Sequence, residues 1–290
     1  DSINTLLGQA DKGAQFVFGS LVDRKLMSQA FGAGNDYIFF FKVVPTIIFV
    51  AVLVNMFYHL GVLQRVVSTM GKGVHWLMGV SGAEALSNVA STFVGQVEAQ
   101  IMIKPYLKNM TNSELMASMT GSFACIAGGV MAVYISLGVP AAYLLAASLM
   151  AAPGALVISK IMFPETEKSE TEGMVKMDII KTHANLVDAI AAGASEGLKV
   201  GLNVIAMLIG FIALIALVDL GLGHIGAWIN MPSLSMNLIL GKVFSVFAFA
   251  MGVPAQDVEV AGALMGKKMV VNEFVAYLDM VHLKATLDPK

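Results

Sequence analysis

Charged residues and cysteines are both scarce in this chain of 290 residues. Only 13% of the residues are charged, the formal net charge is −2, and Cys125 is the single cysteine. One cysteine forms neither an internal disulfide nor a cysteine-based metal site, and the five histidines contain no pair at helical spacing. The near-neutral charge without a basic block argues against nucleic acid as a partner.

Apolar residues are correspondingly abundant. They make up 57% of the chain and give it a mean hydropathy of +0.76, whereas a typical soluble domain is about 45–50% apolar and about 25% charged. Four stretches have the length and composition of membrane-spanning helices, the second of them interrupted by Gly and Ser. They are 38–60, 114–137, 139–163 and 197–220. The sequence therefore predicts an all-α polytopic membrane protein.

Two further stretches mix apolar and charged residues. Residues 1–36 and 64–82 are too polar to cross a bilayer, so we expect amphipathic helices at the membrane surface. For residues 1–36, the pattern is equally compatible with a soluble surface helix.

Residues 83–107 are broadly apolar but do not resemble an ordinary span. They include Gly95 near the middle and several polar or acidic side chains. Each half around Gly95 has only about 11 residues, too few to cross a bilayer alone. The stretch therefore predicts a re-entrant hairpin of two half-length helices that fold back at Gly95, surrounded by protein or a watery cavity.

A second abnormal region lies near the C-terminus. Residues 236–253 form a short, hairpin-like apolar segment, and residues 258–281 are apolar apart from a few charged and amide side chains. A hairpin followed by a broken helix thus occurs twice. This order predicts inverted repeats with re-entrant helical hairpins and broken transmembrane helices, the arrangement typical of transporters with a midplane binding site.

These patterns divide the chain into four predicted regions. Interfacial helices and one transmembrane scaffold helix occupy 1–82, and the first repeat of a transport core occupies 83–163. A polar interfacial linker follows at 164–196, and the second repeat, with its last helix missing, occupies 197–290. Because the chain begins with Asp rather than Met, we expect it to be part of a longer protein.

Two clusters combine a carboxylate with an amide inside these abnormal segments. Gln96 and Glu98 follow Gly95, while Asn272 and Glu273 interrupt the last apolar stretch. A carboxylate at membrane depth is costly unless it is paired or solvated, so each cluster predicts a site for a small polar solute. The alternatives are an extramembrane loop for the first cluster, and for the second a Lys–Glu pair that only fixes helix packing.

The second cluster carries the most specific motif. The run from Gly266 to Tyr277, GKKMVVNEFVAY, resembles the signature of the concentrative nucleoside transporters, in which a lysine equivalent to Lys268 precedes Asn-Glu-Phe-Val-Ala. The run 95–98, GQVE, is similar to the Gly-Gln-Ser/Thr-Glu motif of that family's first hairpin. The runs 151–154 and 163–167 are also similar to the family, and the resemblance covers essentially the whole chain.

The resemblance implies a homotrimer in the plasma membrane, the inner membrane of a bacterium. Each protomer would import nucleosides by an elevator-like motion coupled to a cation gradient, without a cofactor. Gln96, Val97 and Glu98 would bind the nucleobase, and Glu273, with Asn272 nearby, would bind the ribose hydroxyls. A carboxylate suits a vicinal diol because it can accept two O–H bonds at once, and charge-assisted bonds are the stronger kind.

The resemblance also points to a cation site. Sodium-coupled members use an Asn of the first hairpin and a Ser of the next broken helix, and the aligned residues here are Ser91 and Gly129. Backbone carbonyls near Val94 and Gly129 could contribute further oxygen ligands. Because Gly129 has no side-chain oxygen, the sequence favours a proton, carried by Glu98 or Glu273, over sodium as the coupling ion.

Two other functions are compatible with part of the pattern. A gated channel or pore on the same scaffold would use Glu98 and Glu273 as a cation filter. An intramembrane hydrolase would use the same two carboxylates, but the sequence contains no metal motif and no activated nucleophile. We therefore expect a transporter rather than an enzyme.

Overall fold

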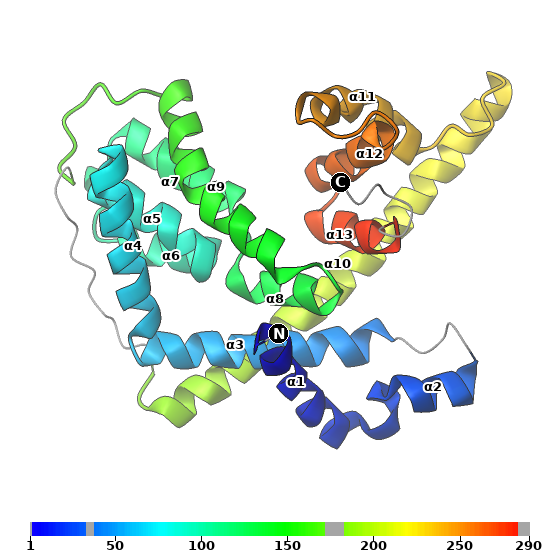
Figure 1. The fold of residues 1–290 in the computed structure, drawn as a ribbon, viewed down its shortest axis with the longest axis horizontal. Coiled ribbons are helices and arrows are strands. Elements are labelled where there is room, and N and C mark those ends of the chain that lie inside the picture. Colours follow the sequence, from blue (N-terminus) through cyan, green and yellow to red (C-terminus); the bar gives the residue numbers. More distant parts are fainter. Residues whose placement is uncertain (1, 33–37, 172–182, 284–290) are drawn as a thin grey trace. The chain divides into compact units, whose positions relative to one another are not determined.

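The chain is described by a computed structural model that covers residues 2–32, 38–171 and 183–283 (Figure 1). Every regular element within these ranges is a helix, as predicted. The chain divides into two compact units, Asp1–Gly201 and Leu202–Lys290. Part of the predicted polar linker, 172–182, and the end of the chain, 284–290, lie outside the described residues.

The first unit begins with the helices that the sequence assigned to the membrane surface and to one span. Its helices are α1 (Ser2–Phe18), α2 (Arg24–Phe31), α3 (Phe39–His59), α4 (Val62–Met78), α5 (Gly82–Phe93), α6 (Gln96–Ile103), α7 (Asn112–Ala124), α8 (Gly128–Ser136) and α9 (Ala141–Met162). Helix α10 (Leu186–Trp228) starts in this unit, and its part from Leu202 onward belongs to the other. The second unit continues with α11 (Met236–Ala250), α12 (Val258–Val270) and α13 (Glu273–Leu283).

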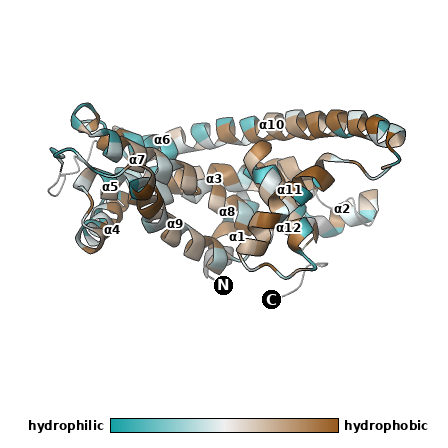
Figure 2. Ribbon diagram, turned by 90° about the horizontal axis from the view of Figure 1, so that it is seen from above, coloured by the Kyte–Doolittle hydropathy of each residue, from teal (hydrophilic) through white to brown (hydrophobic). Residues whose placement is uncertain are grey.

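The predicted spans match the helical segments that are long and apolar enough to cross a membrane; the second of these consists of α7 and α8. These are Phe39–His59, Asn112–Ser136, Ala141–Met162 and Leu186–Trp228. The last has 43 residues and begins well before the predicted span at 197–220. Figure 2 shows that the apolar residues concentrate toward its C-terminal part. The sequence assigned the first turns of this helix to the polar linker at 164–196. The helix begins within that linker because polarity alone does not end a helix.

Helices α3 and α10 pack with their backbones in direct contact within the first unit. A Cβ atom added to Gly197 would lie 2.6 Å from the Cα of Ile48, and one added to Gly193 would lie 2.8 Å from the carbonyl oxygen of Ala51. Asn55 Nδ2 also donates a hydrogen bond to Glu196 Oε2 at 2.9 Å. Lipid provides little hydrophobic drive for helix association, so small residues and interhelical hydrogen bonds hold such crossings together.

The predicted re-entrant hairpin and broken span are both present. Helices α5 and α6 are separated by Val94 and Gly95, and α7 and α8 by residues 125–127. Within the first unit, α5 packs against α6, α7 and α9. The hairpin is therefore enclosed by protein, as a re-entrant segment requires.

Two buried carboxylates organise the base of this hairpin. Glu84 and Glu114, 1% and 0% exposed, form capping boxes with Ser81 and Thr111 at the starts of α5 and α7. Lys160 of α9 forms an ion pair with Glu84. Each carboxylate therefore stabilises the start of its own helix and has polar partners despite its burial.

The segment that follows α9 closes over this base. Ser169 and Thr171 both donate hydrogen bonds to Glu114, and the carbonyl of Thr171 accepts from the Gly82 amide at 2.9 Å. Ser113 Oγ donates to the carbonyl of Phe163 at 2.8 Å. We call residues 163–171 the strap, because they tie the starts of α5 and α7 to the end of α9.

In the second unit, the hairpin consists of α11 and α12, joined through residues 251–257. Their backbones touch at glycines: a Cβ atom added to Gly262 would lie 2.7 Å from the carbonyl oxygen of Gly241, and one added to Gly266 would lie 2.7 Å from Leu240 Cβ. The sequence had assigned 236–253 alone to a hairpin-like segment. The break predicted within 258–281 lies at residues 271–272, between α12 and α13.

We expect Gly197→Val to destabilise the first unit because its side chain would overlap the backbone of Ile48. Overpacking typically costs about 1–3 kcal/mol, and here the obstacle is backbone rather than a mobile side chain. The thermal unfolding midpoint of the detergent-solubilised protein should fall. Gly210→Val on the same helix is the matched control, since nothing lies within 4 Å of its added Cβ. Equal midpoints for the two variants would contradict the proposed role of this crossing.

Candidate functional site

The turn of the first hairpin depends on Gly95. Its φ of 122° and ψ of 173° lie in a region that is essentially restricted to glycine. Helix α6 begins directly after it, so the exposed side chains of Gln96 and Glu98 both lie in the first turn of a half-length helix. The side chain of Val97 lies outside the described part of the structure.

Glu98 folds back over the turn. A Cβ atom added to Gly95 would lie 2.7 Å from Glu98 Oε2, so the carboxylate occupies the space that any other residue at position 95 would fill. The N–H groups in the first turn of a helix have no partner within that helix, and the helix dipole favours an anion there. Carboxylate, amide and N–H groups at this turn can together hydrogen-bond a planar polar molecule.

The break between α7 and α8 lies against the end of α5. A Cβ atom added to Gly128 would be 2.6 Å from the carbonyl oxygen of Phe93, and Cys125 Sγ lies 3.3 Å from Thr92 Oγ1. Cys125 is extended and begins the break. The turn of the hairpin and the interruption of the next helix are therefore adjacent.

The residues of the predicted cation site have different surroundings. Ser91 is fully buried, donates to the carbonyl of Ser87 at 2.8 Å, and lies 3.3 Å from Ser122 Oγ of α7. Val94 is also buried, directly before Gly95. A side chain at Gly129 would approach Val50 of α3, at 3.9 Å, rather than Ser91.

Several polar residues of the hairpin bind α7. Gln100 Nε2 donates to Ser122 Oγ at 2.8 Å, and Ser118 Oγ donates to Gln100 Oε1 at 3.0 Å. Asn88 Nδ2 donates to the carbonyls of Glu84 and Ala117 at 2.9 and 3.2 Å. These bonds join α5 and α6 to α7 and explain much of the polarity of 83–107.

Ser122 and Cys125 were not selected from the sequence. Both lie in the stretch between 114 and 137 that Gly and Ser interrupt. That composition signals the interruption, but their contacts with Ser91 and Thr92 join positions more than 30 residues apart. Only the folded arrangement reveals such contacts.

The second cluster has a similar local design. Asn272 precedes α13, and its Oδ1 accepts a hydrogen bond from the Phe274 amide at 2.7 Å, which caps the helix. Asn272 Nδ2 lies 3.5 Å from Met207 Sδ of α10. Glu273 is the first residue of α13 and is partly buried. Each cluster thus places a glutamate in the first turn of a helix that follows a break.

The structure separates the roles of two adjacent lysines. Lys268, which the sequence suggested as a partner for the charge of Glu273, is exposed. Lys267 is 7% exposed and forms an ion pair with Asp279 of α13. Of the two lysines at the end of α12, Lys267 is therefore the one whose side chain is buried.

Comparison with known protein families assigns most of the chain. Residues 143–290 match the family described as "Na+ dependent nucleoside transporter C-terminus", and residues 40–141 match the family described as "Nucleoside recognition". Together the two matches include both predicted repeats.

Curated relatives match over almost the whole chain. An uncharacterized transporter of Haemophilus influenzae is 41% identical over 96% of this chain and 65% of its own length. The nucleoside permease NupC of Helicobacter pylori is 38% identical, with the same coverage of 96% and 65%. Sodium/nucleoside cotransporter 1 of Rattus norvegicus is 39% identical over 98% of this chain and 42% of its own length. The chain thus spans slightly less than two-thirds of the length of these bacterial relatives.

Solved structures of a related transporter have the same fold. CNTnw in an inward-facing, substrate-bound state is 39% identical, with a TM-score of 0.90 over 100% of this chain and 66% of that chain. A variant of CNTnw in an outward-facing state gives a TM-score of 0.91 with the same identity and coverage. These likenesses confirm the predicted polytopic, all-α membrane fold. The relatives are transporters, in agreement with the prediction that the chain is not an enzyme.

We expect Gly95→Ala to open the first hairpin locally. The backbone conformation at Gly95 costs a non-glycine residue about 1–3 kcal/mol, and the new methyl group would displace the Glu98 carboxylate. Buried Cys125 contacts Thr92 beside this turn, so a thiol-reactive dye should label Cys125 faster in the variant than in the unchanged protein. Both proteins are prepared with Cys125 as their single cysteine. Gly154→Ala, with nothing within 4 Å of its added Cβ, is the control. An unchanged labelling rate at Cys125 would contradict the proposed strain.

Proposed function

The chain belongs to the concentrative, Na+-dependent nucleoside transporter family, and we propose that it forms the transport core of a cation-coupled nucleoside symporter. The observation that carries the proposal is the repeated placement of a glutamate and an amide at the start of a half-length helix after a break. Names of relatives, including a nucleoside permease and a sodium/nucleoside cotransporter, support the substrate class. Because the chain spans about two-thirds of its bacterial relatives, we assign the activity to the whole protein of which it is the core.

In this proposal, Gln96, Val97 and Glu98 bind the nucleobase. Gln96 offers a donor and an acceptor on one amide, which matches the alternating donors and acceptors on the edge of a base. Glu98 accepts hydrogen bonds from ring N–H groups. The exposure of both side chains at the hairpin turn supports this role.

Glu273 binds the ribose hydroxyls. Its carboxylate can accept bonds from both hydroxyls of a vicinal diol. Asn272 contributes mainly by capping α13, since its Oδ1 already accepts the Phe274 amide. The cap fixes the backbone from which Glu273 projects.

A sodium ion would occupy the region of the first hairpin turn, near Ser91, Val94 and Gly129, whereas a proton would be carried by Glu98 or Glu273. The family description names Na+, which supports sodium. The side chains favour a proton, because Gly129 supplies no side-chain oxygen and Ser91 supplies a hydroxyl in place of an amide. We propose proton coupling, with sodium as the competing outcome of the transport assay.

The transporter assembles as a homotrimer in the bacterial inner membrane and moves its core by an elevator-like displacement. The inward-facing and outward-facing structures of the related transporter CNTnw support alternating access. The apolar spans of this chain support a multi-pass location in a lipid bilayer.

Glu273→Gln should weaken the binding of uridine by about 1.5–3 kcal/mol, the range for hydrogen bonds to charged groups. The same change should hardly affect 2′,3′-dideoxyuridine, which lacks both hydroxyls. Isothermal titration of the full-length protein with the two ligands provides the comparison. Glu259→Gln, an exposed glutamate in the first turn of α12, is the matched control. Equal losses for the two ligands would refute the ribose assignment.

Proteoliposomes of the full-length protein should accumulate uridine against its gradient when an inward proton gradient is imposed without sodium. The membrane potential is held constant throughout. Accumulation that needs external sodium and ignores the pH gradient would reverse the ion assignment. Ser91→Asn combined with Gly129→Ser should then increase sodium dependence, because the first change replaces a hydroxyl by an amide carbonyl and the second adds a side-chain oxygen. Passive equilibration alone would indicate a channel.

A further inference from the structure

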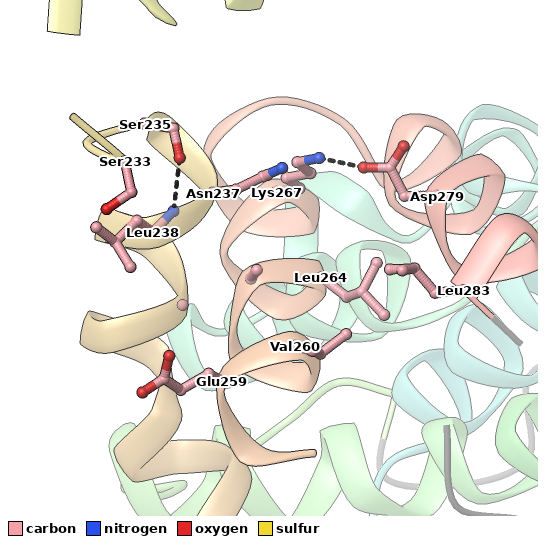
Figure 3. A pocket seen from close by; sticks show the side chains of 12 residues that line it. Ser233, Ser235, Asn237, Leu238, Glu259, Val260, Leu264, Lys267, Asp279 and Leu283 are labelled. Carbon is pink, nitrogen blue, oxygen red and sulfur yellow. Dashed lines mark hydrogen bonds and ion pairs between the residues drawn. The ribbon is translucent and has the colours of Figure 1, made fainter. Parts of the chain in front are cut away.

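Lys267 contacts the corner between α12 and α13 in two ways. Its backbone carbonyl accepts hydrogen bonds from the amides of Val271 and Asn272, at 2.9 and 3.0 Å, and so closes the end of α12. Its side-chain ammonium reaches past the corner and pairs with the carboxylate of Asp279 on α13 (Figure 3). One residue therefore restrains both sides of the break.

This ion pair is largely withdrawn from solvent. The side chain of Lys267 is 9% exposed and that of Asp279 is 34% exposed. Removing one partner of such a pair leaves a poorly solvated charge, whereas replacing both by apolar residues is often neutral for stability. The ion pair therefore need not increase the stability of the fold, and its position relative to Glu273 points to a different role.

The geometry links the pair to Glu273. Asp279 lies six residues after Glu273 on the same short helix, about 9 Å along its axis. An ion pair at Asp279 restrains the rotation of α13 about that axis. Because Asn272 fixes the start of the helix, the two restraints together determine the direction in which Glu273 projects.

A cavity lies beside the pair. It has a volume of about 360 Å³ and is bordered by α11, α12 and α13, with the ion pair on its wall (Figure 3). Its lining includes Asn237, Val260 and Leu264 together with both charged residues. Because the side of α13 that faces this cavity is not fully packed, packing alone does not fix the rotation of α13 about its axis.

We propose that Lys267 and Asp279 are positioning residues that aim Glu273 at the ribose, so that they determine selectivity for the sugar hydroxyls without contacting the solute. This inference rests on the proposed role of Glu273. A purely structural pair would influence stability and would leave the preference between ribose and dideoxyribose unchanged.

The test compares single, double and reversed variants of the pair in the full-length protein. Lys267→Met should weaken uridine binding about tenfold or more and change 2′,3′-dideoxyuridine binding by less than about twofold, and Asp279→Asn should act in the same way. The double variant Lys267→Met with Asp279→Leu should recover the thermal midpoint but not uridine affinity. The reversed pair, Lys267→Asp with Asp279→Lys, should recover both. Lys242→Met, which breaks the exposed pair with Glu259 on the same hairpin, should change neither.

Two results would overturn the inference. One is an equal loss of affinity for both ligands, and the other is a loss of thermal stability with an unchanged ligand preference. Glu273→Gln, measured in the same series, separates this failure from that of the proposed function. If Glu273→Gln is selective for uridine and the pair variants are not, the positioning role alone is wrong. If a single variant does not fold, the double and reversed variants decide the question.

Discussion

Half-length helices in a membrane protein must satisfy the polar groups at their ends without help from bulk water, and the structure of both units follows from this requirement. At the base of the first repeat, Glu84 and Glu114 cap their own helices; Lys160 forms an ion pair with Glu84, and hydroxyl groups donate hydrogen bonds to Glu114. At the corner between α12 and α13 in the second unit, Asn272 caps the start of α13. The glutamates proposed to bind solute, Glu98 and Glu273, also stand in the first turns of half-length helices, α6 and α13.

Much of the fold could be predicted because the membrane imposes simple rules of length and polarity. Long apolar runs with few charges identified the spans, and a glycine between two runs of about 11 residues identified the turn at Gly95. The start of α10 could not be predicted, because its polar first turns gain their stability from packing on α3 through Gly193 and Gly197. The pairing of α11 with α12 was missed for a similar reason: it depends on backbone contact at glycines.

The predictions for the site were less complete because they needed contacts between distant positions. The sequence motifs located both glutamates, and the structure places each after a break. Which of two adjacent lysines faces inward depends on the helix rotation, and the structure selects Lys267 over Lys268. Ser122 meets Ser91 only because α7 packs along the hairpin. The polar residues within 83–107 predicted a re-entrant hairpin, but not that Asn88 of α5 and Gln100 of α6 would bind α7.

The strap has a consequence for how this chain could be divided into fragments. The last span of the first repeat ends at Met162, so hydropathy would place a boundary there. The hydrogen bonds of Ser169 and Thr171 to Glu114, and of Gly82 to Thr171, cross that boundary. A fragment cut directly after the span would therefore leave a carboxylate buried without its hydroxyl donors. A split-protein or circularly permuted version that preserves these bonds must therefore keep the chain continuous through Thr171.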